Sequence, residues 1–95
     1  MSAKKNNILL VEDEEHLHEA LKLNLEMEGY DVSSSFDGAN ALQQIQHAHF
    51  DLIILDVMLP LLDGFSLTET VRLNNIETPI LILNAKNTIP KKIVV

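Results

Sequence analysis

The chain contains no cysteine and no long hydrophobic run. The lack of cysteine excludes disulfide bonds, thiolate metal sites and a cysteine nucleophile. A membrane-spanning helix needs about 20 apolar residues, and the apolar runs in this sequence are much shorter. The basic N-terminus is followed by a short apolar run that Glu12 interrupts, so no signal peptide is predicted. We therefore expect a cytoplasmic location and no membrane partner.

Positive charge is also scarce. The 95 residues include 7 Lys and Arg against 14 Asp and Glu, which gives a formal net charge of −7. This balance argues against nucleic acid as a direct partner, because a phosphate backbone attracts basic surfaces. A hydrophobic content of 46% is typical of a folded globule. The length predicts a single domain, near the small end of what can bury its own core.

Two patterns alternate along the sequence and predict an α/β fold. Short apolar or alternating runs predict strands at residues 7–11, 30–35, 51–56 and 80–83. Apolar residues at helical spacing predict helices at residues 14–28, after Asp37 and after Asp63. The order β-α-β-α-β-α-β predicts a parallel sheet with right-handed crossovers and helices on both faces.

The predicted helices have apolar faces and recognisable ends. Gly29 is suited to end the first helix, and Asp37 is suited to cap the second. The side chains expected to face the core are Leu17, Ala20, Leu21 and Leu25 in the first helix, Ala41, Leu42 and Ile45 in the second, and Phe65, Leu67 and Val71 in the third.

Acidic side chains stand at the ends of two predicted strands. Asp56 follows the apolar residues 52–55, and Glu12 and Asp13 follow the apolar residues 8–11. The ends of parallel strands meet at the carboxyl edge of the sheet, where open α/β folds bind their ligands. Three carboxylates placed there would raise one another's pKa unless a cation lay between them. The pattern therefore predicts a divalent metal ion beside one reactive aspartate.

Four segments together resemble the receiver domain of the two-component response-regulator family. They are residues 8–14 (ILLVEDE), 51–60 (DLIILDVMLP), 63–65 (DGF) and 78–83 (TPILIL). Their order and spacing match the family over about residues 6–86, although each segment alone would be weak. The resemblance implies a flavodoxin-like sheet with strand order 2-1-3-4-5 and a phosphoaccepting role in signal transduction.

The resemblance also implies roles for individual residues. Asp56 would be the phosphoacceptor, receiving its phosphoryl group from a histidine kinase or a phosphotransfer protein. Asp13 would bind Mg²⁺ directly, and Glu12 would do so through water or with its longer side chain. Met58 would contribute its backbone carbonyl to the metal. Asn84 stands where the family usually has a Thr or Ser that bonds the phosphoryl group.

The C-terminal part departs from the family pattern. The family's last strand with its Lys, and the helices on either side of it, have no match, so we expect a truncated receiver with an atypical tail at residues 87–95. Phosphorylation should then be slower, because an ammonium group near the phosphoryl oxygens is missing. We also expect residues 79–83 to form an open edge. The tail can pair with this edge in its own chain or in a partner, and we expect a homodimer.

Four histidines are the other candidate ligands. His16 and His18, like His47 and His49, are two residues apart, a spacing that points side chains away from each other on a helix. We expect all four to be solvated.

Three classes of function remain open on the sequence alone. The first is a phosphoaccepting switch, which the motifs favour. The second is a Mg²⁺-dependent phosphohydrolase, which commonly needs a second acid two residues after the nucleophile, where this chain has Met58. The third is a receiver remnant that cannot be phosphorylated and acts as an interaction module.

Overall fold

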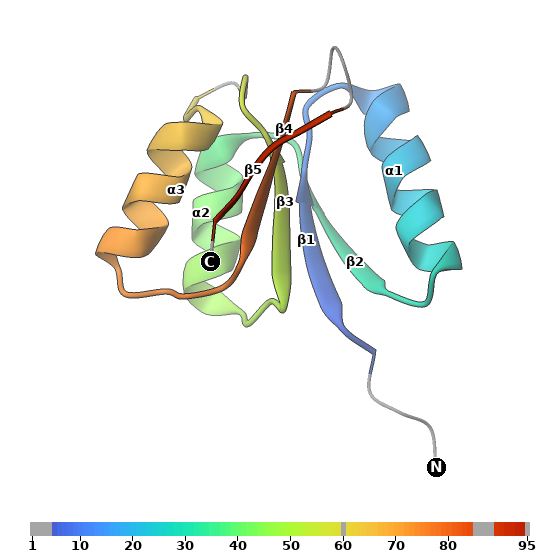
Figure 1. The fold of residues 1–95 in the computed structure, drawn as a ribbon, viewed down its shortest axis with the longest axis horizontal. Helices are drawn as coiled ribbons and strands as arrows, with labels where there is room; N and C mark the ends of the chain where they lie inside the picture. Colours follow the sequence, from blue (N-terminus) through green and yellow to red (C-terminus); the bar gives the residue numbers. More distant parts are fainter. Residues whose placement is uncertain (1–4, 60, 85–88, 95) are drawn as a thin grey trace.

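The computed structural model describes residues 5–59, 61–84 and 89–94. The elements follow in the order β1 (Asn7–Val11), α1 (Glu15–Met27), β2 (Asp31–Ser35), α2 (Gly38–His47), β3 (Leu52–Asp56), α3 (Gly64–Leu73), β4 (Ile80–Asn84) and β5 (Ile89–Val94). The strands form one sheet with the order β2-β1-β3-β4-β5 (Figure 1). The first four strands are parallel, so the predicted flavodoxin-like arrangement is confirmed.

Acidic caps begin all three helices in the described part of the chain. The side chain of Glu14 accepts hydrogen bonds from the amides of His16 and Leu17 at the start of α1. Asp37 and Asp63 cap α2 and α3 in the same way. Each carboxylate satisfies amides that the first turn of a helix leaves unpaired, and its charge is favourable beside the positive end of the helix dipole.

The helices lie on both faces of the sheet, and each face has its own apolar cluster. In Figure 1, α2 and α3 lie on one face and α1 lies on the other. Alternate strand residues point to opposite faces, so Leu9 and Ile53 pack with the α2 and α3 side, whereas Ile8 and Ile54 pack toward α1. The first cluster holds most of the fully buried apolar residues, including Leu67 and Val71, which were predicted to face the core.

The prediction that β4 would be an open edge is wrong. β5 runs antiparallel to β4 and pairs with it from Ile80 to Asn84. A parallel return would need a crossover of a dozen or more residues, whereas a short connection allows only an antiparallel one. Pairing of the tail within its own chain was one of the two outcomes expected from the sequence. Lys86 and tail residues 87, 88 and 95 lie outside the described residues.

Two predictions about helix faces also need correction. Phe65 was expected in the core, but it lies in the first turn of α3 and its side chain is 55% exposed. Ala20 was expected to face the sheet and is exposed.

None of the three helices in the described ranges has the length and apolar character that crossing a bilayer requires.

Candidate acidic site at the carboxyl edge of the sheet

Glu12, Asp13 and Asp56 come together where β1 and β3 end. Val11 pairs with Leu55 in the parallel ladder, so the residues that follow them, Glu12 and Asp56, lie at the same level of the sheet. One carboxylate oxygen from each of the three acids lies within 4.8 Å of the others. Glu12 and Asp56 are 3% and 7% exposed, whereas Asp13 is exposed to solvent. The structure thus brings together the three carboxylates that the strand ends predicted.

Glu12 is held in place by contacts along its backbone and side chain. Its amide donates to the carbonyl oxygen of Ser35 at 3.0 Å, and its Oε2 accepts from the amide of Glu14 at 2.9 Å. Burial is the main cause that raises the pKa of Glu12 from 4.5 to about 7. The hydrogen bond from the Glu14 amide opposes this rise, and the charges of Asp56 and Asp13 add to it. The ionised form of the Glu12 carboxyl group is therefore unfavourable unless a cation lies nearby.

Asp56 is oriented by the loop that follows it. Its Oδ1 accepts a hydrogen bond from the amide of Met58 at 3.1 Å, while the side chain of Met58 points into solvent and is 67% exposed. The amide of Gly64 donates to the carbonyl oxygen of Val57 at 3.0 Å, which ties the start of α3 to the end of β3. A Cβ at position 64 would lie 2.6 Å from the carbonyl oxygen of Asp56. Glycine is therefore required for this close approach.

The donor set fits a hard divalent cation such as Mg²⁺. All three side chains offer carboxylate oxygens, the ligand type that Mg²⁺ prefers. A cation among them would offset both the mutual repulsion and the cost of ionising the buried Glu12. The raised pKa of Glu12 is the observation that supports this fit independently of the motif.

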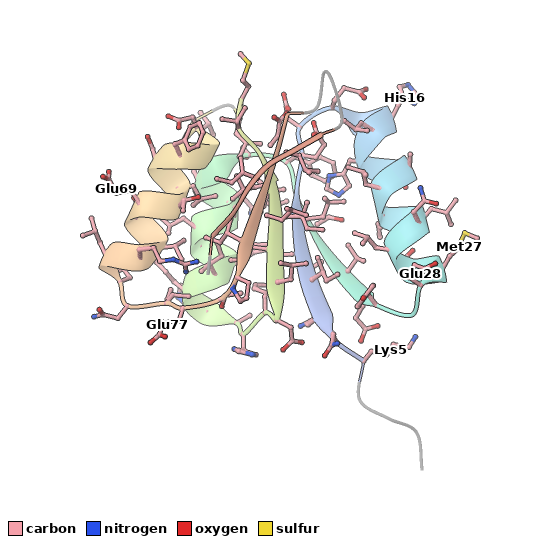
Figure 2. The ribbon with its side chains drawn as sticks, in the orientation of Figure 1. Lys5, His16, Met27, Glu28, Glu69 and Glu77 are labelled. Carbon is pink, nitrogen blue, oxygen red and sulfur yellow. The ribbon has the colours of Figure 1, made fainter. Side chains whose placement is uncertain are left out.

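The prediction for the histidines is correct for three residues and wrong for one. His16, His47 and His49 are exposed. Figure 2 shows the His16 side chain at the N-terminal end of α1. His18 is 0% exposed, and its Nδ1 lies 2.9 Å from the carbonyl oxygen of Glu12. Position 18 lies on the face of the helix that carries Leu21 and Leu25, so the periodicity did contain a sign of its burial.

Asn84 is the last residue of β4. Asp56 pairs with Leu83 in the β3–β4 ladder, which places the backbone of Asn84 at the same edge as the acidic site. Its side chain is outside the part of the molecule that the structure describes.

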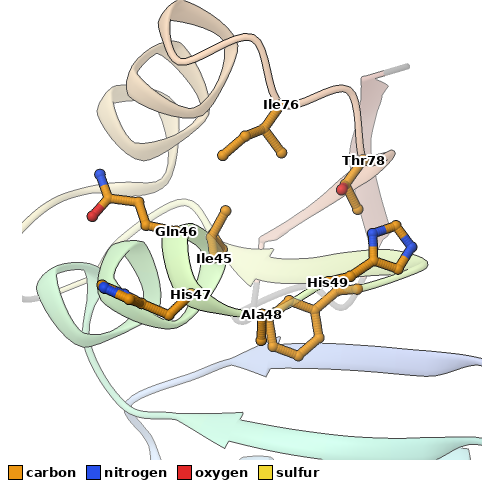
Figure 3. A pocket seen from close by; sticks show the side chains of 8 residues that line it. Ile45, Gln46, His47, Ala48, His49, Ile76 and Thr78 are labelled. Carbon is orange, nitrogen blue, oxygen red and sulfur yellow. The ribbon is translucent and has the colours of Figure 1, made fainter.

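A separate hollow lies at the opposite edge of the sheet (Figure 3). Its volume is about 330 Å³, and it lies between the end of α2 and the segment before β4. The lining residues are Ile45, Gln46, His47, Ala48, His49, Phe50, Ile76 and Thr78. It contains none of the predicted site residues.

A family model described as the response regulator receiver domain matches residues 8–95. The chain belongs to this receiver family. It is 46% identical over 80 residues to the alkaline phosphatase synthesis transcriptional regulatory protein PhoP of Bacillus subtilis, a match that covers 84% of this chain and 33% of PhoP. The chain spans 40% or less of the length of the curated relatives first matched.

Solved receiver structures agree with this fold. The Francisella response regulator 1452 receiver domain has a TM-score of 0.83 at 37% identity, covering 85% of this chain and 67% of its own. The response regulator TrrA of Thermotoga maritima, solved in complex with Mg²⁺ and BeF, has a TM-score of 0.80 at 32% identity and covers 84% of this chain and 70% of its own.

Membership of the receiver family decides among the three classes of function that the sequence left open. Receivers are phosphoaccepting components of two-component signal transduction and not classical enzymes, and the family binds Mg²⁺ at its acidic cluster. The phosphohydrolase and inactive-remnant alternatives are therefore not favoured.

Proposed function

We propose that this receiver accepts a phosphoryl group on Asp56. The observation that carries the proposal is the convergence of Glu12, Asp13 and Asp56 within 4.8 Å at the carboxyl edge of the sheet. In the transfer, an Asp56 oxygen forms a bond to phosphorus while the phosphorus–nitrogen bond to the donor's histidine breaks. The departing imidazole keeps the electron pair of that bond. The products are an aspartyl phosphate and a neutral histidine after proton uptake.

The residues around Asp56 suit this reaction. The amide of Met58 holds Oδ1, so the carboxylate can present Oδ2 to the phosphorus. Glu12 and Asp13 would hold Mg²⁺ together with Asp56 and the carbonyl of Met58. When bound, Mg²⁺ supplies positive charge that stabilises the phosphoryl oxygens in the transition state. Holding the nucleophile in line is the other main requirement of phosphoryl transfer.

Asn84 is proposed to contact the phosphoryl group from the neighbouring strand. Its position directly after the residue paired with Asp56 supports this assignment. An amide can donate a hydrogen bond to a phosphoryl oxygen, as the hydroxyl of Thr or Ser would. Asn84→Thr should therefore retain phosphorylation and change the lifetime of the aspartyl phosphate.

The partner that follows from this function is a histidine kinase or a phosphotransfer protein that carries phosphohistidine. We propose a cytoplasmic location and no direct contact with nucleic acid for residues 1–95, in keeping with the net charge of −7. Self-association also remains a prediction. Because β4 is covered by β5, a dimer formed by strand pairing would have to use β5 or β2, and light scattering at micromolar concentration tests it.

The decisive experiment is intact-mass measurement after incubation with Mg²⁺ and acetyl phosphate. Wild type should gain the mass of a single phosphoryl group, and hydroxylamine should remove it, as expected for an acyl phosphate. Asp56→Asn should gain none. Asp51→Asn is the matched control, because Asp51 lies just before the same strand, at its other end, and should leave the gain unchanged. Phosphate on the Asp56→Asn protein would refute the assignment.

A further inference from the structure

His18 is a buried polar residue that the proposed reaction does not use. Its side chain is 0% exposed, and its ring stacks on Phe36 with a centroid distance of 4.2 Å and an interplanar angle of 23°. Phe36 directly follows β2. The ring therefore packs between α1 and the loop after β2, immediately below the loop that carries Glu12 and Asp13.

The hydrogen bond of His18 shows which of its ring nitrogens is a donor. Nδ1 lies 2.9 Å from the backbone carbonyl oxygen of Glu12. A carbonyl oxygen only accepts, so Nδ1 must carry the hydrogen and donate it. Among the described residues, Nε2 is buried without a partner. A phenylalanine or leucine would fill the same space without leaving a nitrogen unpaired, so packing alone does not explain a histidine here.

The carbonyl that His18 binds belongs to a residue of the acidic site. The amide of Glu12 is held by Ser35, and its carboxylate is held by the amide of Glu14. The Nδ1 contact of His18 completes this set by fixing the carbonyl. Glu12 is thus anchored at both ends of its backbone, and the peptide unit that leads into Asp13 is fixed with it.

We propose that His18 is a positioning residue that anchors the β1–α1 loop and so sets the positions of the Glu12 and Asp13 carboxylates for Mg²⁺. This inference rests on the proposed function, because it gives His18 a role in assembling the same site. Residues that orient metal ligands without touching the metal affect affinity by about ten- to a hundredfold. Coordination geometry around Mg²⁺ is strict, so a displaced loop should weaken binding.

Side-chain geometry offers a matched set of variants. The amide nitrogen of Asn is attached to Cγ, as Nδ1 of His is, so His18→Asn can keep the donor to Glu12. His18→Gln places its amide one bond further out, near the position of Nε2. His18→Phe keeps the ring and its stacking on Phe36 but has no donor. Phe36→Leu removes the stacking and keeps the histidine.

Two measurements on these variants test the proposal. Calorimetric titration with Mg²⁺ should give wild-type affinity for His18→Asn and Phe36→Leu, and about tenfold weaker affinity for His18→Gln and His18→Phe. Hydrogen exchange without metal should show faster exchange of the Glu12 and Glu14 amides in the same two weakened variants. The variants should not rank in the same order by melting temperature as by Mg²⁺ affinity, because His18→Phe retains the packing of the ring on Phe36.

Either of two results would overturn the inference. One is an affinity for Mg²⁺ that follows the melting temperature, with His18→Phe equal to wild type or His18→Asn as weak as His18→Gln. The other is unchanged amide exchange in His18→Phe. A wild-type protein that binds no Mg²⁺ would instead refute the proposed function, and the metal-free exchange data would still show whether His18 anchors the loop.

Discussion

The two edges of the parallel sheet use acidic residues in opposite ways. At the amino edge, Asp51 accepts from the amide of Asn7 at 2.7 Å and lies 3.5 Å from His49. At the carboxyl edge, three carboxylates face one another, and the pKa of Glu12 is raised to about 7. Asp51 at the amino edge stands beside a donor and a histidine, whereas the carboxyl edge has gathered acids that a cation would stabilise. Acids at both edges accept hydrogen bonds from amides, so it is the closeness of several carboxylates that distinguishes the candidate binding site from a single structural acid.

The largest expected difference between the two edges is in Mg²⁺ binding. Millimolar Mg²⁺ should raise the melting temperature of wild type, because binding to the native state alone stabilises it by mass action. Asp13→Asn should abolish this rise, since a ligand charge is lost. Asp51→Asn should retain it. A rise of equal size in Asp13→Asn would show that the metal binds elsewhere, and thermal melts with and without EDTA provide the measurement.

A second test inserts one methyl group beside Asp56. Gly64→Ala places a Cβ 2.6 Å from the Asp56 carbonyl oxygen, and overpacking of this kind costs about 1–3 kcal/mol. We expect lower stability in urea and weaker Mg²⁺ binding. Gly29→Ala is the control. Its φ of 98° makes a side chain unfavourable, but no atom lies within 4 Å, so stability should fall without a loss of metal affinity.

The pH dependence sharpens the comparison further. Because the pKa of Glu12 is about 7 in the folded, metal-free protein and 4.5 ordinarily, folding favours its protonated form. The metal-free protein should lose stability as the pH rises from about 4.5 to about 7. Mg²⁺ must displace that proton, so its affinity should fall by up to about tenfold per pH unit below 7. Titrations at pH 8 and pH 6 test this, and equal affinities would contradict it.

The smallest effect should come from Asp63, an acid of the carboxyl edge that has its own partners. Bonds from Ser66, together with the amide of Phe65, lower the pKa of Asp63 below 3.8. Its contribution to stability is therefore present above pH 3.8 and lost as the pH falls through the lower, folded-state pKa. Asp63→Ala should reduce the melting temperature slightly at pH 7 and leave Mg²⁺ binding unchanged. Asp63→Asn can still cap α3, so it should lower the melting temperature less than Asp63→Ala does.

Sequence reasoning recovered the features that depend on local pattern. The alternation of apolar strands and amphipathic helices was enough to give a parallel α/β sheet and the meeting of Glu12, Asp13 and Asp56. The order of the strands came from the resemblance to the receiver family. The helix cap at Asp37, and the start of a helix after Asp63, followed from residue type and position. These features are set by short-range stereochemistry and by the rule that parallel strand ends share an edge.

Features that depend on distant contacts were missed. The helical spacing of His18 with Leu21 and Leu25 indicated its face, but its contacts with Phe36 and with the carbonyl of Glu12 could not be read from the local sequence. The exposure of Phe65 depends on how the first turn of α3 is placed, which its helical spacing with Leu67 and Val71 did not show.

The pairing of β1 with β3 has a consequence for how the site is assembled during folding. Asn7 and Asp51, 44 positions apart in sequence, bond to each other at the start of the two strands. Bringing such distant segments together costs chain entropy, because a long loop must close before any contact is gained. Non-local pairings of this kind slow folding. The β4–β5 pair closes over a much shorter connection. The carboxylates that gather at the ends of β1 and β3 thus meet through one of the least local contacts of the chain, and no isolated fragment that lacks either strand should bind the metal.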